Sequence, residues 1–145
     1  MTRHNLFNPP DMPPASGFSY GALSDSGRLL HIAGLTGHAP DGSLADDLVV
    51  QFGAACESVA KVIGEAGGQP GDLVSMTIYT TAIGEYRGRL SELGAVYRAV
   101  FGRHFPPMAL LGIDELFDPR AMIELVCVAV VPDEGQSSST TTGPS

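Results

Sequence analysis

The stretch from Ala121 to Val131 reads AMIELVCVAVV and predicts a β-strand with two apolar faces. Side chains alternate along a strand, so one face carries Ile123, Leu125, Cys127, Ala129 and Val131. The other face carries Met122, Glu124, Val126, Val128 and Val130. Both faces of this strand must therefore be covered, and one of them holds a carboxylate.

The residues before this strand predict the other elements. Apolar residues recur at spacings of three and four from Leu48 to Ala66 and from Tyr86 to Phe101, which is typical of two amphipathic helices. Shorter apolar segments predict strands at 18–23, 28–33, 74–79 and 108–113. The turn residues at 24–27 favour a hairpin between the first two strands. The predicted order is β-β-α-β-α-β-β.

This order predicts an α+β fold, with one mixed sheet and both helices on one face of it. Two helices cover one face only, and the sequence predicts no third helix for the other. We therefore expect another subunit to bury the second face. This expectation also fits a chain in which only 17% of the residues are charged.

The 145 residues fit a single domain. Residues 1–16 are expected to be an irregular arm because they contain Pro9, Pro10, Pro13 and Pro14. The domain is expected to span residues 17–132. Residues 133–145 are rich in Ser and Thr and contain no apolar anchor, so we expect a disordered tail.

Composition disfavours some partners. Sixteen acidic and eight basic residues give a net charge of −8, which disfavours binding to nucleic acid or to an anionic membrane. No apolar run reaches the ~18 residues of a membrane span, and the N-terminus lacks the apolar stretch of a signal peptide. Two cysteines, Cys56 and Cys127, are too few for a disulfide framework. The expected location is cytoplasmic.

Two common catalytic arrangements are disfavoured. Residues 17–21 read GFSYG and match the G-x-S-x-G nucleophile elbow, but that motif requires a strand-to-helix turn, and here a strand is predicted to follow. The four histidines are scattered and the two cysteines stand alone, so no metal site is expected.

Glu124 is the most informative single residue. An unpaired carboxylate in an apolar strand carries a desolvation cost of several kcal/mol. Glu124 therefore either pairs with donors from a neighbouring chain or acts as a general acid/base in a cleft, and the residues leave both alternatives open. Arg120 falls on the same face of the strand as Glu124, but roughly 13 Å of strand separates the two side chains, which is too far for pairing within one chain.

Several stretches resemble the Rid superfamily, also called the YjgF-type or reactive-intermediate deaminase family, over about residues 17–131. They are GFSYGA at 17–22, LLHIAG at 29–34, EAGG at 65–68, DLVSMTIY at 72–79, FPP at 105–107 and IELVCVA at 123–129. The resemblance implies a chorismate-mutase-like fold and a homotrimer with a central barrel and clefts between subunits. It also implies hydrolysis of enamines and imines to a keto acid and ammonia, without a metal or organic cofactor.

The sequence departs from this family at the substrate-binding arginine. That position is Met108, and a thioether cannot form the bidentate contact that a guanidinium makes with a carboxylate. A tyrosine of the family's cleft falls at Ser19, with Tyr20 adjacent, and a cleft asparagine falls at Gly94. Glu124 matches a cleft carboxylate that is proposed in the family to assist the attack of water.

Two functions follow as hypotheses. The first is an arginine-lacking Rid paralogue that hydrolyses an enamine or imine less acidic or bulkier than a 2-imino acid, with Glu124 as acid/base. The second is a non-catalytic trimer that binds a metabolite or a partner enzyme. The ribonuclease activity attributed to some relatives is disfavoured by the acidic charge balance. The candidate ligand-binding residues are Phe18, Ser19, Tyr20, Met108, Leu110 and Arg120.

Overall fold

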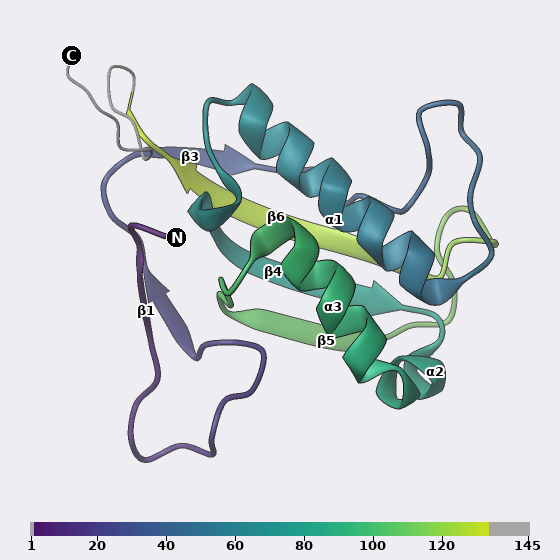
Figure 1. The fold of residues 1–145 in the computed structure, drawn as a ribbon, viewed down its shortest axis with the longest axis horizontal. Helices are drawn as coiled ribbons and strands as arrows, with labels where there is room; N and C mark the ends of the chain where they lie inside the picture. The colour runs from purple at the N-terminus through teal and green to yellow at the C-terminus, as the bar shows by residue number, and fades with distance from the viewer. Residues whose placement is uncertain (1, 134–145) are drawn as a thin grey trace.

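The computed structural model describes residues 2–133, and Figure 1 shows their fold. A four-stranded sheet contains, in spatial order, β3 (Arg28–His31), β6 (Ile123–Val131), β4 (Leu73–Thr80) and β5 (Met108–Gly112). β6 is antiparallel to β3 and β4, whereas β4 and β5 are parallel, so the sheet is mixed. The two-faced apolar strand is thus a central strand.

Helices α1 (Leu48–Glu65) and α3 (Leu90–Phe101) lie side by side on one face of this sheet (Figure 1). α1 begins after Asp47, whose carboxylate accepts hydrogen bonds from the backbone N–H groups of Val49 and Val50. It ends at a left-handed residue, Gly67, with a φ of 88°. A short helix, α2 (Ile83–Gly88), leads from β4 into α3.

The core lies between the helices and the sheet. Phe52 and Val59 of α1 and Leu93 of α3 belong to one buried cluster with the helix-facing residues of β6. These β6 residues are at most 2% exposed, and they are Ile123, Leu125, Cys127, Ala129 and Val131. The alternation predicted for this strand is therefore confirmed on its core side.

Neither α1 nor α3 covers the opposite face of the sheet, which we call the open face. By register it carries Tyr79, Leu111 and Glu124 on neighbouring strands, together with Leu29 and Val126. Leu29 is 61% exposed, Leu111 44% and Val126 37%. Exposed apolar side chains gathered on one face are typical of a surface that another molecule covers.

The N-terminal region differs from the prediction. β2 (Gly21–Leu23) does not form a hairpin with β3 but pairs with β1 (Asn5–Phe7), within the segment expected to be irregular. Gly21 permits this pairing because a Cβ there would collide with the Phe7 ring. The β1–β2 ribbon forms a lobe apart from the sheet (Figure 1). The sheet accordingly has four strands instead of five, and the element order gains β1 and α2.

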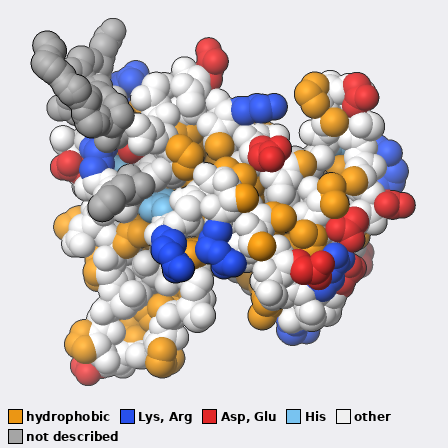
Figure 2. Space-filling view, viewed as in Figure 1, with side chains coloured by type: hydrophobic (Ala, Val, Ile, Leu, Met, Phe, Trp, Pro, Cys, Tyr) orange, Lys and Arg blue, Asp and Glu red, His pale blue; other side chains and the backbone are white. Residues whose placement is uncertain are grey.

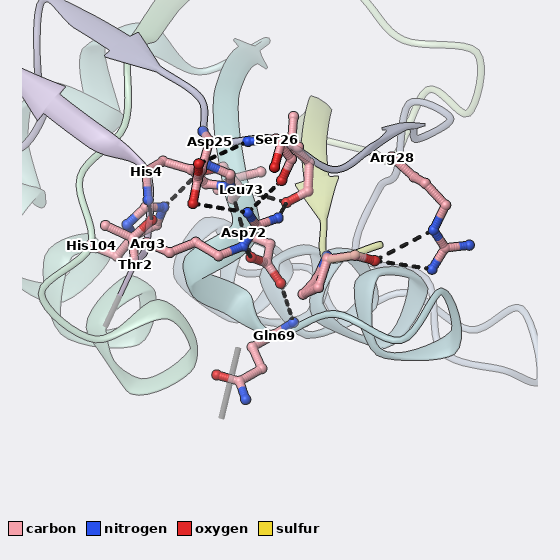
Figure 3. Close-up of polar contacts among 12 residues, drawn as sticks. Thr2, Arg3, His4, Asp25, Ser26, Arg28, Gln69, Asp72, Leu73 and His104 are labelled. Atoms are coloured by element: carbon pink, nitrogen blue, oxygen red, sulfur yellow. Dashed lines mark hydrogen bonds and ion pairs between the residues drawn. The ribbon is translucent and has the colours of Figure 1, made fainter. Parts of the chain in front are cut away.

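A buried polar cluster fastens the N-terminal segment to the domain (Figure 3). Asp72, at the end of the 3₁₀ turn η1 (Pro70–Asp72), is 2% exposed and accepts a hydrogen bond from the Gln69 backbone N–H. Its other oxygen lies 3.4 Å from Nε of Arg3 and 3.8 Å from Nε2 of His4. Both side chains also donate to the carbonyl of Val130, so the segment closes over the end of β6.

No helix among residues 2–133 has the length and apolar character needed to cross a membrane. Of the tail predicted at 133–145, residues 134–145 lie outside the described residues.

Candidate functional site

Glu124 lies on the open face of β6, opposite Tyr79 of β4. Its chain neighbours Ile123 and Leu125 are fully buried beneath the helices, so the Glu124 side chain extends to the other side of the sheet. The side chain is half-buried and has no hydrogen bond or ion pair with any of residues 2–133. Its carboxylate is therefore available to a water, a ligand or a second subunit.

Gly34 forms the surface on which this carboxylate rests. A methyl group on Gly34 would collide with a carboxylate oxygen of Glu124 and lie 2.9 Å from its Cδ. The loop is held along β6 by two reciprocal backbone hydrogen bonds between Leu35 and Leu125, of 2.9 and 2.8 Å. The close approach of the carboxylate thus requires glycine at position 34.

An apolar cavity of about 380 Å³ lies on the helix side of the sheet, between the edge strand β5 and α3. Figure 2 shows a notch at the lower edge of the molecule, between the β1–β2 lobe and the helices. Burial raises the pKa of Tyr86 to about 12 and also raises the pKa of Tyr97, so both lining phenols stay neutral. Within the described part of the chain, no charged side chain lines the cavity, whose walls include Phe18, Phe52, Phe105, Met108 and Leu110.

The structure brings Phe18, Met108 and Leu110 together but separates them from Glu124. Met108 lies opposite Met76, and Leu110 lies opposite Ile78, on the helix side of the sheet. The three residues line the apolar cavity, whereas Glu124 extends from the opposite face. Within one chain they form two separate sites.

Ser19 and Tyr20 hold the N-terminal segment in place. The Ser19 hydroxyl donates to the carbonyl of Phe105 at 2.6 Å, and the Tyr20 hydroxyl donates to the carbonyl of Pro13 at 2.9 Å. The Tyr20 ring packs edge-on against Phe18. Strand β2 follows this segment, so Ser19 does not occupy the strand-to-helix turn of a nucleophile elbow.

Arg120 and Arg103 do not pair with Glu124. The Arg120 guanidinium is 62% exposed and donates to both carboxylate oxygens of Asp118, at 3.2 and 2.8 Å. These hydrogen bonds help to hold the pKa of Asp118 below its usual range. Arg103 is exposed and has no hydrogen bond or ion pair with residues 2–133.

Three polar side chains that the sequence did not connect also meet in space. Oγ1 of Thr36 lies 2.5 Å from Nδ1 of His38, and Nε2 of His38 lies 2.8 Å from Oδ2 of Asp118. His38 also lines a second cavity of about 300 Å³, together with Glu57 and Lys61 of α1. The Thr-x-His spacing is visible in the sequence, but Asp118 lies 80 residues beyond His38, so no local pattern joins them.

No group of three or more potential metal-ligating side chains occurs among residues 2–133. Cys56 and Cys127 are both buried, and desolvation raises the pKa of each thiol, that of Cys127 to about 12. Both cysteines are therefore neutral core residues rather than thiolate nucleophiles.

Fold and site together define a small α+β domain with one helix-covered sheet face, an open apolar face that carries Glu124, and an apolar cavity at the sheet edge. A comparison with protein-family models matches residues 10–131 to the family described as Endoribonuclease L-PSP. The chain therefore belongs to this family, which is also known as the YjgF or Rid family. Met108 lies within the matched region.

Solved structures share this fold. The Rid-family protein YyfB from Yersinia pestis, described as being of unknown function, is 27% identical with a TM-score of 0.79, covering 90% of this chain and 100% of its own. A YjgF/YER057c/UK114 family member from Mycobacterium tuberculosis is 25% identical with a TM-score of 0.61, covering 88% and 99%. RidA from an Antarctic Psychrobacter is 19% identical with a TM-score of 0.64, covering 88% and 99%. A comparison with curated protein sequences finds no match.

Proposed function

We propose that this protein is a homotrimeric hydrolase of small metabolites, with its sites in clefts between subunits around Glu124. The observation that carries this proposal is a carboxylate without a partner among residues 2–133, on a sheet face that carries exposed apolar side chains. A subunit packed on this face would remove the apolar surface from water. It would also enclose Glu124 in a cleft.

The proposed reaction is the hydrolysis of an imine, or of the enamine that tautomerises to it, to a carbonyl compound and ammonia. Water attacks the carbon of the C=N bond, and the nitrogen leaves after gaining protons. A carboxyl group within hydrogen-bond distance can take a proton from the water and give one to the nitrogen. Glu124 fills this role in the proposal, and the reaction requires no metal or organic cofactor.

The proposed substrate is uncharged. Met108 stands where the family resemblance places an arginine, and the cavity that it lines has no charged side chain. A substrate carboxylate there would be desolvated without a partner, at a cost of several kcal/mol. Because β5 is an edge strand, the proposal has a neighbouring subunit pack along this edge and bring its own Glu124 to the cavity. The proposal does not include RNA, because a net charge of −8 repels phosphates.

Ammonia release from freshly generated imines tests this proposal. The panel pairs imines of apolar, uncharged carbonyl compounds with 2-imino acids of similar size. We expect faster ammonia release from the uncharged imines, and at least a ~100-fold loss of turnover in Glu124→Gln, because general acid/base groups typically contribute factors of this size.

Glu65→Gln is the matched control, since Glu65 lies at the end of α1 and away from both cavities. Turnover in this variant should equal that of the wild type. Wild-type protein that accelerates none of the reactions, or Glu124→Gln protein with full turnover, would contradict the proposal.

A second candidate function is non-catalytic binding of an apolar metabolite. The observation that favours it is that the 380 Å³ cavity and Glu124 lie on opposite sides of the sheet. A thermal-shift panel of small apolar compounds tests it. Gly94→Leu should abolish any shift, because the new side chain would enter the cavity, and a Cβ at position 94 meets only the flexible end of Arg98. Glu124→Gln should keep the shift.

A further inference from the structure

Thr36, His38 and Asp118 form a continuous hydrogen-bonded chain of hydroxyl, imidazole and carboxylate. The contacts measure 2.5 Å between Thr36 and His38 and 2.8 Å between His38 and Asp118, and all three residues are partly buried. Hydroxyl, imidazole and carboxylate in this order are the arrangement through which proteins move protons to and from a hydroxyl oxygen.

The carboxylate fixes the direction of each hydrogen bond. Arg120 donates to both oxygens of Asp118, so Asp118 is ionised and can only accept. The neutral His38 ring must then carry its proton on Nε2, which leaves a lone pair on Nδ1. That lone pair accepts the hydroxyl proton of Thr36. The lone pairs of the Thr36 oxygen remain free to accept from a further donor.

Thr36 follows directly on a bridge to β6 next to Glu124. Leu35 and Leu125 exchange two backbone hydrogen bonds across an isolated antiparallel bridge. Because the two segments run in opposite directions, Thr36 and Glu124 adjoin this bridge at the same end. Gly34, on which the Glu124 carboxylate rests, belongs to the same segment. The chain therefore ends at the candidate site.

We propose that Thr36, His38 and Asp118 form a proton relay that supplies the Glu124 site with a second acid/base group. This inference rests on the proposed hydrolysis. Converting C=NH and water into C=O and ammonia moves two protons from the water oxygen to the nitrogen. Glu124 moves one of them, and the relay moves the other.

Each step balances. On attack, the water forms the C–O bond and gives a proton to the Glu124 carboxylate. The electron pair of the C=N bond goes to the nitrogen, which takes that proton from Glu124. On collapse, the hydroxyl passes its proton to Oγ1 of Thr36 while the Thr36 proton passes to Nδ1 of His38. The C=O bond forms, the C–N bond breaks, and the nitrogen takes the His38 proton through Thr36. Ammonia leaves, and both groups are restored.

Charged groups surround His38 on more than one side. Asp118 supplies a negative charge at hydrogen-bond distance, which stabilises the imidazolium formed during collapse. From α1, Glu57 and Lys61 line the same cavity as His38 and bring one charge of each sign. Arg120 neutralises part of the Asp118 charge. Protons can exchange with solvent through this 300 Å³ cavity.

The kinetic test measures kcat and KM as functions of pH on the imine that the wild type hydrolyses best. His38→Gln should lower kcat about 100-fold with little change in KM, and should remove one limb of the pH profile. Thr36→Val should also lower kcat about 100-fold with little change in KM and remove the same limb of the pH profile. Thr36→Ser, which keeps the hydroxyl, should retain most of the wild-type kcat. Ser58→Ala, which alters the same cavity outside the relay, should match the wild type.

A second measurement needs no substrate. The ¹⁵N NMR signals of the His38 ring should show the proton on Nε2, and they should shift in Glu124→Gln but not in Glu65→Gln. Unchanged His38 signals in Glu124→Gln overturn the relay. Wild-type turnover combined with an unaltered pH profile in His38→Gln overturns the relay but leaves the proposed hydrolysis intact. Wild-type protein without any turnover overturns the proposed hydrolysis itself.

Discussion

The carboxylates that stabilise this fold are engaged by their own chain, and Glu124 is not. Asp47 caps α1 through two backbone N–H groups, and the buried Asp72 lies beside Arg3 while accepting a backbone hydrogen bond. Glu124 has no partner among residues 2–133, although it occupies a central strand where an unpaired charge is costly. A carboxylate kept there without a structural partner fits a role in binding or chemistry.

Replacing Gly34 by alanine should damage the site rather than the fold. The added Cβ would occupy the position of the Glu124 carboxylate and force it to move. We expect turnover to fall at least tenfold, equivalent to about 1.4 kcal/mol of transition-state stabilisation, as measured by ammonia release. Gly64→Ala is the control, because a Cβ there meets nothing within 4 Å and alanine stabilises a helix interior by about 0.5–1 kcal/mol. Normal turnover in Gly34→Ala would contradict the placement of Glu124.

His104 should make the stability of the protein depend on pH. His104 is 2% exposed; its Nε2 donates to the carbonyl of Leu73, and its Nδ1 has no hydrogen-bond partner among residues 2–133. Burial lowers the pKa of His104 below the ordinary 6.5, so between these two values the unfolded chain binds more protons than the folded one. The stabilisation of the folded state by burying neutral His104 is therefore complete above pH 6.5. It is lost as the pH falls from 6.5 through the lower pKa of the folded state.

Urea unfolding of the wild type and of His104→Gln at pH 5.5 and pH 7.5 measures this effect. The free energy of unfolding should drop more on acidification in the wild type than in His104→Gln. All other titratable groups are common to both proteins, so the difference isolates His104. Equal drops would show that His104 does not contribute.

At the scale of elements, the strands and helices with long regular patterns could be predicted, and the short ones could not. β6 has nine residues and α1 has 18, so the spacing of apolar residues shows a clear strand or helix period in each. Both elements form as expected. β1 is only three residues long, and its register depends on contacts with β2. The hairpin prediction failed because turn residues at 24–27 show where the chain bends, not which strands pair.

Arg3 should contribute to holding the N-terminal segment on the domain. Arg3→Ala would remove two hydrogen bonds to backbone carbonyls and leave the buried Asp72 without its nearest cation. We expect the free energy of unfolding to fall by about 1–3 kcal/mol in urea denaturation. Arg28→Ala, which also removes contacts with backbone carbonyls but none with a carboxylate, should change it by about 0.5 kcal/mol or less. Equal effects of the two substitutions would contradict a specific role for the Arg3–Asp72 contact.

At the scale of the whole molecule, one sheet face is covered by helices, and the other carries exposed apolar side chains except at the end of β6, which the N-terminal segment covers. The sequence predicted a strand with two apolar faces, of which helices could cover only one, and the structure puts Glu124 on the uncovered face. The candidate relay could not be predicted, because Thr36, His38 and Asp118 come from loops whose meeting depends on the complete fold. The spacing of apolar residues shows which face of a helix or strand is buried. It does not show which loops come together in the folded protein to form a site.

A charge placed on the open face should separate the subunits. Val126→Glu puts a carboxylate on the central strand of this face, where a packed subunit would desolvate it. We expect a lower oligomeric mass in sedimentation velocity and loss of ammonia release. Val50→Glu is the matched control, because Val50 is 54% exposed but lies on α1, across the sheet. A Val126→Glu protein with the mass and activity of the wild type would place the subunit contact elsewhere.

The most direct test is the native mass of the unmodified 145-residue chain at micromolar concentration, because the proposed site exists only between subunits. Native mass spectrometry should give three times the 15.1 kDa of one chain. A wild-type protein that remains a single chain would leave Glu124 facing solvent and would contradict the proposed inter-subunit site.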